Sequence, residues 1–137
     1  MNTPKILSIE DDAMLNGIVS SALTNGGFLV IVAAGGAEGL QKAKTEQPQL
    51  ILLDIMMADI DGFEVLRQLK ADDATKNIPV VILSNLGKRE EIERGLALGA
   101  TTYIIKSSIL PHDILSIIRT QLSLPEPTPP QEEPTVT

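Results

Sequence analysis

Short, strongly apolar runs alternate along the chain with longer segments whose apolar residues recur at helical spacing. Short runs rich in Val, Ile and Leu are typical of buried strands, whereas spacing of i, i+3, i+4 and i+7 indicates amphipathic helices. The pattern predicts strands over residues 5–9, 28–32, 50–53, 78–83 and 101–105. It predicts helices over residues 13–25, 36–45, 62–71, 88–98 and 111–122. Strand and helix therefore alternate from the first element to the last.

The strands read as solid apolar runs rather than as alternating ones, which is expected where helices cover both faces of a parallel sheet. This order of elements predicts a doubly wound α/β fold. Asp12 can cap the first helix, and glycines at 26 and 27 can end it. The buried face of that helix is predicted to comprise Met14, Leu15, Ile18, Val19, Ala22 and Leu23.

The chain is expected to form one domain over residues 1–122, followed by a different kind of segment. A length of 137 residues suits a single domain with a real core. Five of the nine prolines fall within residues 123–137, a stretch with few large apolar side chains. Such a composition cannot offset its ordering entropy by burial, so we expect a disordered tail or a linker stub there.

Polar residues follow four of the apolar runs at the point where each predicted strand ends. Glu10, Asp11 and Asp12 follow the first, Asp54 the third, Ser84 the fourth and Lys106 the fifth. Ligands of open parallel sheets bind outside the carboxyl ends of the strands, so these groups predict a site for a cation and a phosphate. Alone, each has a plainer interpretation: a solvated capping loop, a strand-end hydroxyl and a surface lysine.

Composition narrows the class of protein. A net charge of −7 and a pI near 4.6 argue against nucleic-acid binding by this chain alone, since such binding needs a basic face. The chain has no cysteine, which excludes disulfides and thiolate chemistry. It shows neither a signal peptide nor an apolar run long enough to span a membrane, so we expect a cytoplasmic protein that binds no membrane.

Together these segments resemble the receiver domain of two-component response regulators, over about residues 5–122. The resemblance implies a CheY-like, flavodoxin-like fold with a five-stranded parallel sheet in the order 2-1-3-4-5. The motifs that carry it are Ile9-Glu10-Asp11-Asp12, Leu53-Asp54-Ile55-Met56-Met57-Ala58-Asp59-Ile60-Asp61-Gly62, Leu83-Ser84-Asn85 and Tyr103-Ile104-Ile105-Lys106.

The resemblance assigns the acidic residues to phosphoryl transfer. Asp54 would be the phosphoacceptor, a carboxylate nucleophile that forms an acyl phosphate. Glu10, Asp11 and Asp54, with the main-chain carbonyl of Met56, would bind Mg²⁺, which prefers oxygen ligands. Clustered carboxylates also repel one another, by about 4 kcal/mol for a pair about 4 Å apart at an effective dielectric near 20, so the cluster itself predicts a cation.

The remaining site residues are assigned in the same way. Lys106 would pair with Asp54 and later with a phosphate oxygen, and Ser84 would donate its hydroxyl to the phosphoryl group. The resemblance implies that Tyr103 then follows Ser84 from an exposed to a buried rotamer. Met56 and Leu86 would flank the path of the attacking water. Because both are apolar, we expect them to lengthen the lifetime of the acyl phosphate.

Three positions depart from the family pattern. Ala58 stands where proline is usual. The absence of proline is expected to loosen slightly the acidic loop that follows Asp54 and carries Asp59 and Asp61. Asn85 replaces a small residue and is expected to narrow access to the phosphoryl group. Ser107 replaces the proline whose preceding bond is cis in the family, and a cis bond costs about 3–4 kcal/mol before any other residue.

We interpret the chain as a receiver that accepts a phosphoryl group from a histidine kinase or phosphotransfer protein and signals to a downstream protein partner. It is expected to be a monomer or a weak, phosphorylation-dependent dimer. Two alternatives stay open: a phosphorylation-independent adaptor, and a fragment of a longer response regulator or hybrid kinase. A haloacid-dehalogenase-like enzyme is disfavoured, because Met56 stands where such enzymes carry a second aspartate. The single histidine, His112, is expected to be an exposed helix residue rather than a phosphotransfer site.

Overall fold

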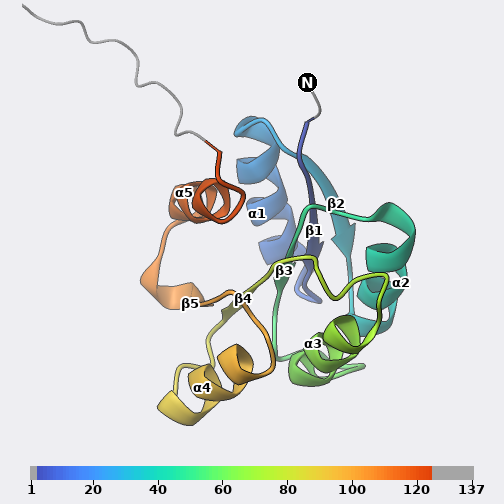
Figure 1. Ribbon diagram of the computed structural model, residues 1–137. Coiled ribbons are helices and arrows are strands. Elements are labelled where there is room, and N and C mark those ends of the chain that lie inside the picture. The colour runs from blue at the N-terminus through green and yellow to red at the C-terminus, as the bar shows by residue number, and fades with distance from the viewer. Residues whose placement is uncertain (1–2, 125–137) are drawn as a thin grey trace, which may run out of the picture.

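The structure is a computed structural model that describes residues 3–124. Strands and helices alternate throughout this range, as the sequence predicts (Figure 1). The strands are β1 (Lys5–Ile9), β2 (Leu29–Ala33), β3 (Leu50–Leu53), β4 (Val80–Ser84) and β5 (Thr102–Ile105). The helices are α1 (Ala13–Asn25), α2 (Gly36–Glu46), α3 (Gly62–Ala71), α4 (Arg89–Ala97) and α5 (Pro111–Gln121), with a 3₁₀ turn η1 (Lys106–Ser108) after β5.

The five strands form one parallel sheet in the order β2-β1-β3-β4-β5. The core falls into two clusters on opposite faces of the sheet: α1 and α5 contribute to one, and α2 and α3 to the other, next to which α4 lies (Figure 1). The predicted fold class and strand order are therefore confirmed. In this arrangement β1 and β3 are neighbours, which brings Glu10 and Asp54 to the same edge of the sheet.

Alternate residues of the central strands serve opposite faces of the sheet. In β3, Leu50 and Leu52 pack toward α1 and α5, whereas Ile51 and Leu53 pack toward α2 and α3. All four side chains are buried. Because both faces are covered, the strand reads as an unbroken apolar run in the sequence. This two-sided packing makes the sheet a rigid platform for the loops at its carboxyl edge.

Strands β2, β4 and β5 begin one or two residues later than predicted, and the residues before β2 and β4 belong to turns. The main-chain N–H of Phe28 donates to the carbonyl of Leu23, so Phe28 closes the end of α1 rather than opening β2. The N–H of Ile78 likewise donates to the carbonyl of Thr75, and β4 starts at Val80. At its other end β4 extends one residue further than predicted, to Ser84, which pairs with Ile105 of β5.

The prediction that every strand is covered on both faces is wrong for the edge of the sheet. In β2, Leu29 and Val32 are exposed, because this strand has a neighbour on one side only and α2 covers it partly. The predicted buried face of α1 is also too wide: Met14 and Ile18 are exposed, whereas Val19 is buried. Helical spacing alone did not separate the centre of that face from its margins.

The C-terminal boundary stays a prediction. Helix α5 ends at Gln121, close to the expected domain limit at residue 122. Residues 125–137, most of the predicted tail, lie outside the described residues. Within residues 3–124, no helix is long and apolar enough to cross a membrane.

Candidate functional site

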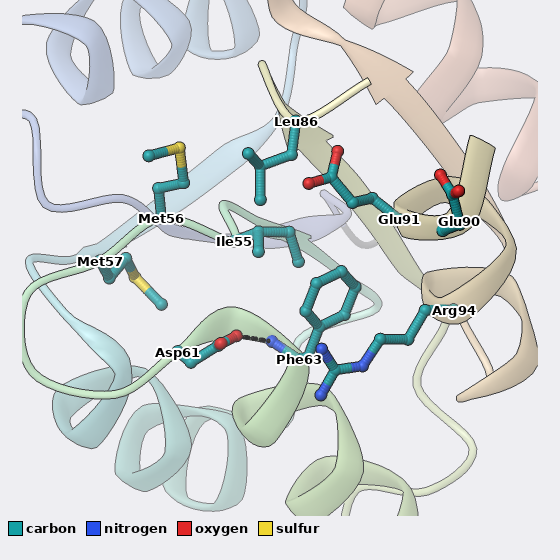
Figure 2. Close-up of a pocket in the computed structure, with 9 residues that line it drawn as sticks. All are labelled: Ile55, Met56, Met57, Asp61, Phe63, Leu86, Glu90, Glu91 and Arg94. Atoms are coloured by element: carbon teal, nitrogen blue, oxygen red, sulfur yellow. Dashed lines mark hydrogen bonds between the residues drawn. The ribbon is translucent and has the colours of Figure 1, made fainter. Parts of the chain in front are cut away.

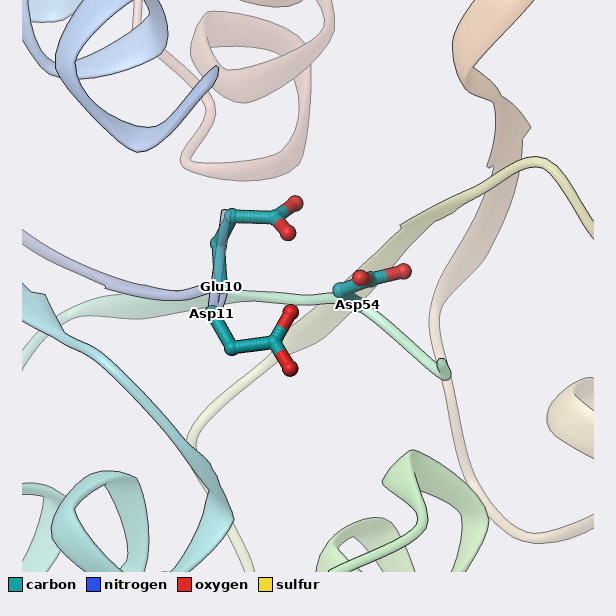
Figure 3. A group of neighbouring side chains, drawn as sticks. All are labelled: Glu10, Asp11 and Asp54. Atoms are coloured by element: carbon teal, nitrogen blue, oxygen red, sulfur yellow. The ribbon is translucent and has the colours of Figure 1, made fainter. Parts of the chain in front are cut away.

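Three carboxylates meet at the carboxyl edge of the sheet. The main-chain N–H of Asp54 donates to the carbonyl of Ile9 at 3.0 Å, which ties the end of β3 to the end of β1. One carboxylate oxygen each of Glu10, Asp11 and Asp54 lies within 4.8 Å of the others, and Figure 3 shows the side chains converging. Glu10 and Asp54 are only 6% and 5% exposed, whereas Asp11 is exposed. The structure thus brings together the three predicted carboxylates.

Lys106 neutralises part of this negative charge. Its Nζ lies 2.7 Å from Glu10 Oε1 and 3.3 Å from Asp54 Oδ2. Burial lowers the pKa of Lys106, but its bond to Glu10 and the charge of Asp54 outweigh burial, so the net pKa is raised and the ammonium stays charged. Burial raises the pKa of Glu10, which the bond from Lys106 only partly offsets. The closest partner of the lysine is therefore Glu10, whereas the sequence pointed to Asp54.

Asp11 is held by the loop between β3 and α3. Its Oδ2 accepts a hydrogen bond from the main-chain N–H of Ala58 at 2.9 Å. The next residue, Asp59, accepts from the N–H groups of Gly36 and Ala37 at the start of α2, at 2.9 and 3.0 Å. These donors hold the pKa of Asp59 at about 2, below its ordinary value of 3.8. The acidic loop, expected to be loosened by the absence of proline at 58, is thus anchored on both sides.

Ser84 and Tyr103 lie on neighbouring strands near the cluster. Ser84 is fully buried, and its Oγ accepts from the main-chain N–H of Leu86 at 3.2 Å. The hydroxyl of Tyr103 donates to the carbonyl of Leu86 at 2.5 Å, and burial raises the pKa of this phenol. The tyrosine is half-buried, and its hydroxyl is held against the main chain of the β4–α4 turn. The β4–α4 turn therefore connects the two predicted switch residues.

The bond between Lys106 and Ser107 is trans, as are all described peptide bonds. Lys106 and Ser107 begin the 3₁₀ turn η1, which was not predicted and which follows β5 directly. The N–H of Ser107 donates to Asn85 Oδ1 at 3.0 Å. Despite the departure from the family pattern, the lysine ammonium still reaches Asp54.

The carboxylates line a cleft of about 210 Å³. A larger groove of about 670 Å³ lies beside it, between the start of α3 and the start of α4 (Figure 2). Met56 is 60% exposed and lines both, whereas Leu86 is partly buried and lines the groove alone. Met56 thus lies between the acidic cleft and a groove lined by both apolar and charged side chains. The cleft is lined by Glu10, Asp11, Asp12, Asp54, Met56, Asn85 and Lys106.

The donor set fits a hard divalent cation. Mg²⁺ takes oxygen ligands at about 2.0–2.1 Å, so two ligands on opposite sides of the ion are about 4.2 Å apart. The carboxylate oxygens of the cluster all lie within 4.8 Å of one another, which is close to this span. The single histidine, His112, lies exposed on α5 beside Asp113, as expected, and is not part of the cluster. Oxygen ligands without nitrogen or sulfur favour Mg²⁺ over zinc.

Sequence reasoning missed a buried polar pair beneath the site. Ser8 Oγ donates to Asn16 Oδ1 at 2.7 Å, and Asn16 Nδ2 donates to the carbonyls of Glu10 at 3.1 Å and Ala33 at 3.3 Å. Asn16 therefore ties α1 to the ends of β1 and β2, directly below the Glu10 side chain. Its inward position was detectable, because Asn16 shares helical spacing with the buried Val19 and Leu23.

The fold and the acidic cluster define a class of protein, doubly wound α/β domains with a carboxylate site at the carboxyl edge of the sheet. Residues 6–119 match the family of the response regulator receiver domain. This chain belongs to that family, so the resemblance noted in the sequence is confirmed.

Relatives by sequence are longer regulators. The chain is 38% identical over 118 residues to "Probable transcriptional regulatory protein SilR" of Salmonella typhimurium, covering 86% of this chain and 50% of that protein. It is 36% identical over 118 residues to "Transcriptional regulatory protein CusR" of Escherichia coli K12, covering 86% and 51%. The chain thus spans about half the length of these relatives.

Solved structures with the same fold cover nearly the whole described range. A CheY-like receiver domain from Methanospirillum hungatei JF-1 has a TM-score of 0.83 at 28% identity, covering 89% of this chain and 95% of that one. The phosphorylated cyanobacterial phytochrome response regulator RcpA has a TM-score of 0.78 at 31% identity, covering 89% and 95%. The chain is therefore similar both to an isolated receiver and to a regulator whose structure was solved in the phosphorylated state.

Proposed function

We propose that this receiver domain accepts a phosphoryl group on Asp54 from a histidine kinase or phosphotransfer protein, in the presence of Mg²⁺. The observation that carries the proposal is the position of Asp54, a carboxylate 5% exposed that forms a cluster with Glu10 and Asp11 and lies 3.3 Å from the ammonium of Lys106. Burying a carboxylate costs free energy, and other carboxylates close by add repulsion. An arrangement of this cost points to a role in chemistry or binding.

The proposed transfer uses the groups that line the cleft. A carboxylate oxygen of Asp54 attacks phosphorus and forms a P–O bond as the P–N bond to the donor histidine breaks, with its electron pair returning to the imidazole. Lys106, already 3.3 Å from Asp54 Oδ2, turns from the carboxylate toward a phosphate oxygen. Ser84, fully buried at the end of β4, is proposed to donate its hydroxyl to another phosphate oxygen. Such positioned charge and hydrogen bonding supply most of the catalysis in phosphoryl transfer.

Glu10, Asp11 and Asp54, with the main-chain carbonyl of Met56, are the groups proposed to hold Mg²⁺. Bound there, the ion would neutralise charge that develops on the phosphoryl oxygens. The cluster of Glu10, Asp11 and Asp54 has only the ammonium of Lys106 beside it among the residues that line the cleft, so a divalent cation would relieve repulsion that Lys106 alone leaves in place.

Phosphorylation with a small acyl phosphate tests the proposal directly. The chain is incubated with acetyl phosphate and Mg²⁺, and its mass is measured. We expect one added phosphoryl group in the parent, none in Asp54→Asn, and a large loss in the double variant Glu10→Gln, Asp11→Asn. Equal modification of Asp54→Asn would refute the assignment, and an unmodified parent would favour the phosphorylation-independent adaptor.

Output is proposed to run through Tyr103 and Ser84, which the β4–α4 turn connects, toward a protein partner on the face of α4, β5 and α5. In this proposal the chain works in the cytoplasm and binds neither nucleic acid nor membrane by itself. We propose a monomer that dimerises weakly after phosphorylation. Sedimentation before and after treatment with beryllofluoride measures this, and a stable dimer of the untreated chain would contradict it.

A further inference from the structure

The loop between β3 and α3 makes two polar contacts that reach in opposite directions. On one side, the main-chain N–H of Ala58 donates to Asp11 Oδ2 at 2.9 Å. On the other, Asp59 Oδ1 and Oδ2 accept from the N–H groups of Gly36 and Ala37. Adjacent residues therefore connect the start of α2 to a carboxylate of the acidic cluster.

The contact between Asp59 and the start of α2 depends on the space that a glycine leaves at residue 35. A Cβ added at Gly35 would lie 2.9 Å from Asp59 Oδ1, closer than Cβ atoms approach other atoms. Glycine at 35 thus leaves the room that the aspartate occupies. Both oxygens of Asp59 have a main-chain donor within 3.0 Å, and these donors hold its pKa at about 2. The carboxylate is therefore ionised and held in one place at neutral pH.

The contact with Asp11 leaves one of its oxygens available. Oδ2 is engaged by the amide of Ala58, whereas the carboxylate as a whole points toward Asp54 and Glu10 (Figure 3). Asp11 is exposed, so little packing restrains its side chain. The hydrogen bond from Ala58 supplies an orientation that burial does not.

We propose that Asp59 and the main-chain N–H of Ala58 are positioning residues for Mg²⁺, because they fix the loop on α2 and thereby orient Asp11 for the ion. The inference rests on the proposed function of the cluster and adds to it a link between α2 and the metal site. Hydrogen bonds that orient metal ligands typically govern affinity by about 10–100-fold.

Variants at residue 58 isolate the amide donor. Ala58→Pro removes the N–H, and Ala58→Gly, its matched control, keeps it. Mg²⁺ binding to the full chain is measured by calorimetry, without any phosphodonor. We expect roughly tenfold weaker binding in Ala58→Pro and parental binding in Ala58→Gly. Equal affinities in the two variants would overturn the proposal.

Variants at residue 59 test the anchor on α2. Asp59→Ala is expected to weaken Mg²⁺ binding roughly as Ala58→Pro does. The double variant Ala58→Pro, Asp59→Ala should bind Mg²⁺ no more weakly than Ala58→Pro alone. Both residues act through one hydrogen bond, from the N–H of residue 58 to Asp11. The control is Asp72→Asn, which changes another loop carboxylate that accepts from the N–H of Ala74. Additive losses, or an equal loss in Asp72→Asn, would contradict a positioning role.

The parent chain separates this inference from the proposed function. Absence of Mg²⁺ binding and of phosphorylation in the parent refutes both. If the parent binds Mg²⁺ and is phosphorylated on Asp54 but Ala58→Pro matches Ala58→Gly, only the positioning role is refuted.

Discussion

The main-chain N–H of Ser107 donates a hydrogen bond to the side-chain oxygen of Asn85, at 3.0 Å. Each residue departs from the family pattern, and the structure shows that the two departures meet. The contact joins the β4–α4 turn to the turn η1 that follows β5. It lies at the mouth of the acidic cleft, which Asn85 lines together with Lys106.

A mutant cycle measures this contact. Asn85→Ala removes the acceptor and Ser107→Pro removes the donor. Each is expected to lower the free energy of unfolding by about 0.5–1 kcal/mol, because the bond is exposed, and the double variant should lose less than the sum. Asn85→Ala should also be phosphorylated faster by acetyl phosphate, since a smaller side chain opens the cleft. Additive destabilisation together with an unchanged rate would show that the contact has no role.

Replacing Lys106 by methionine tests how the lysine ammonium affects Mg²⁺ binding at the proposed site. The lysine side chain is 16% exposed and lies 2.7 Å from Glu10 Oε1, so at the proposed site it would compete with Mg²⁺ for that carboxylate. Lys106→Met should bind Mg²⁺ roughly tenfold more tightly, because a nearby positive charge is lost. Without metal, its unfolding free energy should fall by about 3–5 kcal/mol, since two buried carboxylates lose their partner. Weaker Mg²⁺ binding in this variant would show that Lys106 does not compete.

Asp59 should give the chain a defined dependence of stability on pH. Main-chain donors depress its pKa to about 2 from 3.8, so its contribution is complete above about pH 4 and is lost as pH falls toward 2. Urea unfolding of the parent and of Asp59→Asn should therefore differ most at neutral pH. The difference should shrink between pH 4 and 2. A difference that stays constant across this range would mean that the Asp59 carboxylate is not held as described.

The acyl phosphate is expected to be long-lived. Met56 lines the acidic cleft and Leu86 lines the adjoining groove, and neither side chain can orient an attacking water. Met56→Asn combined with Leu86→Glu should speed dephosphorylation by roughly tenfold or more, because positioned acid–base groups act at this scale. The hydrogen bonds of residue 86 to Ser84 and Tyr103 use its main chain, so they survive the change. If the acyl phosphate of the double variant lives as long as that of the parent, Met56 and Leu86 do not set the rate of dephosphorylation, and Lys106 and Mg²⁺ do.

The fold was predictable because its central strands are covered on both sides. The unbroken run Leu50–Leu53 and its alternation with helical segments suffice for the α/β class. The margins were less predictable. Phe28 and Ile78 look like strand residues, but their N–H groups close turns, and hydropathy carries no information on that choice. Met14 and Ile18 are apolar yet exposed on α1.

The site was predictable where chemistry requires a particular side chain. Glu10, Asp11, Asp54 and Lys106 meet as their positions at the strand ends predicted. The preference of Lys106 for Glu10 was not predictable, because distances of 2.7 and 3.3 Å depend on the path of the turn η1. The roles of residues 58 and 107 were also hidden, since both act through the main chain and their side chains carry no signal.

The hydrogen bonds that begin at Ala58 and Ser107 have a consequence for how the sequence can vary. In each, the donor is a peptide N–H, which every amino acid but proline supplies. Substitution at these two positions therefore leaves the bonds intact, except by the proline that is usual in the family at both. The acceptors Asp11 and Asn85 have no such freedom, because each contributes a side-chain oxygen at a fixed reach. Each of these hydrogen bonds thus joins a position that tolerates most residues, 58 or 107, to one that needs a particular side chain, Asp11 or Asn85.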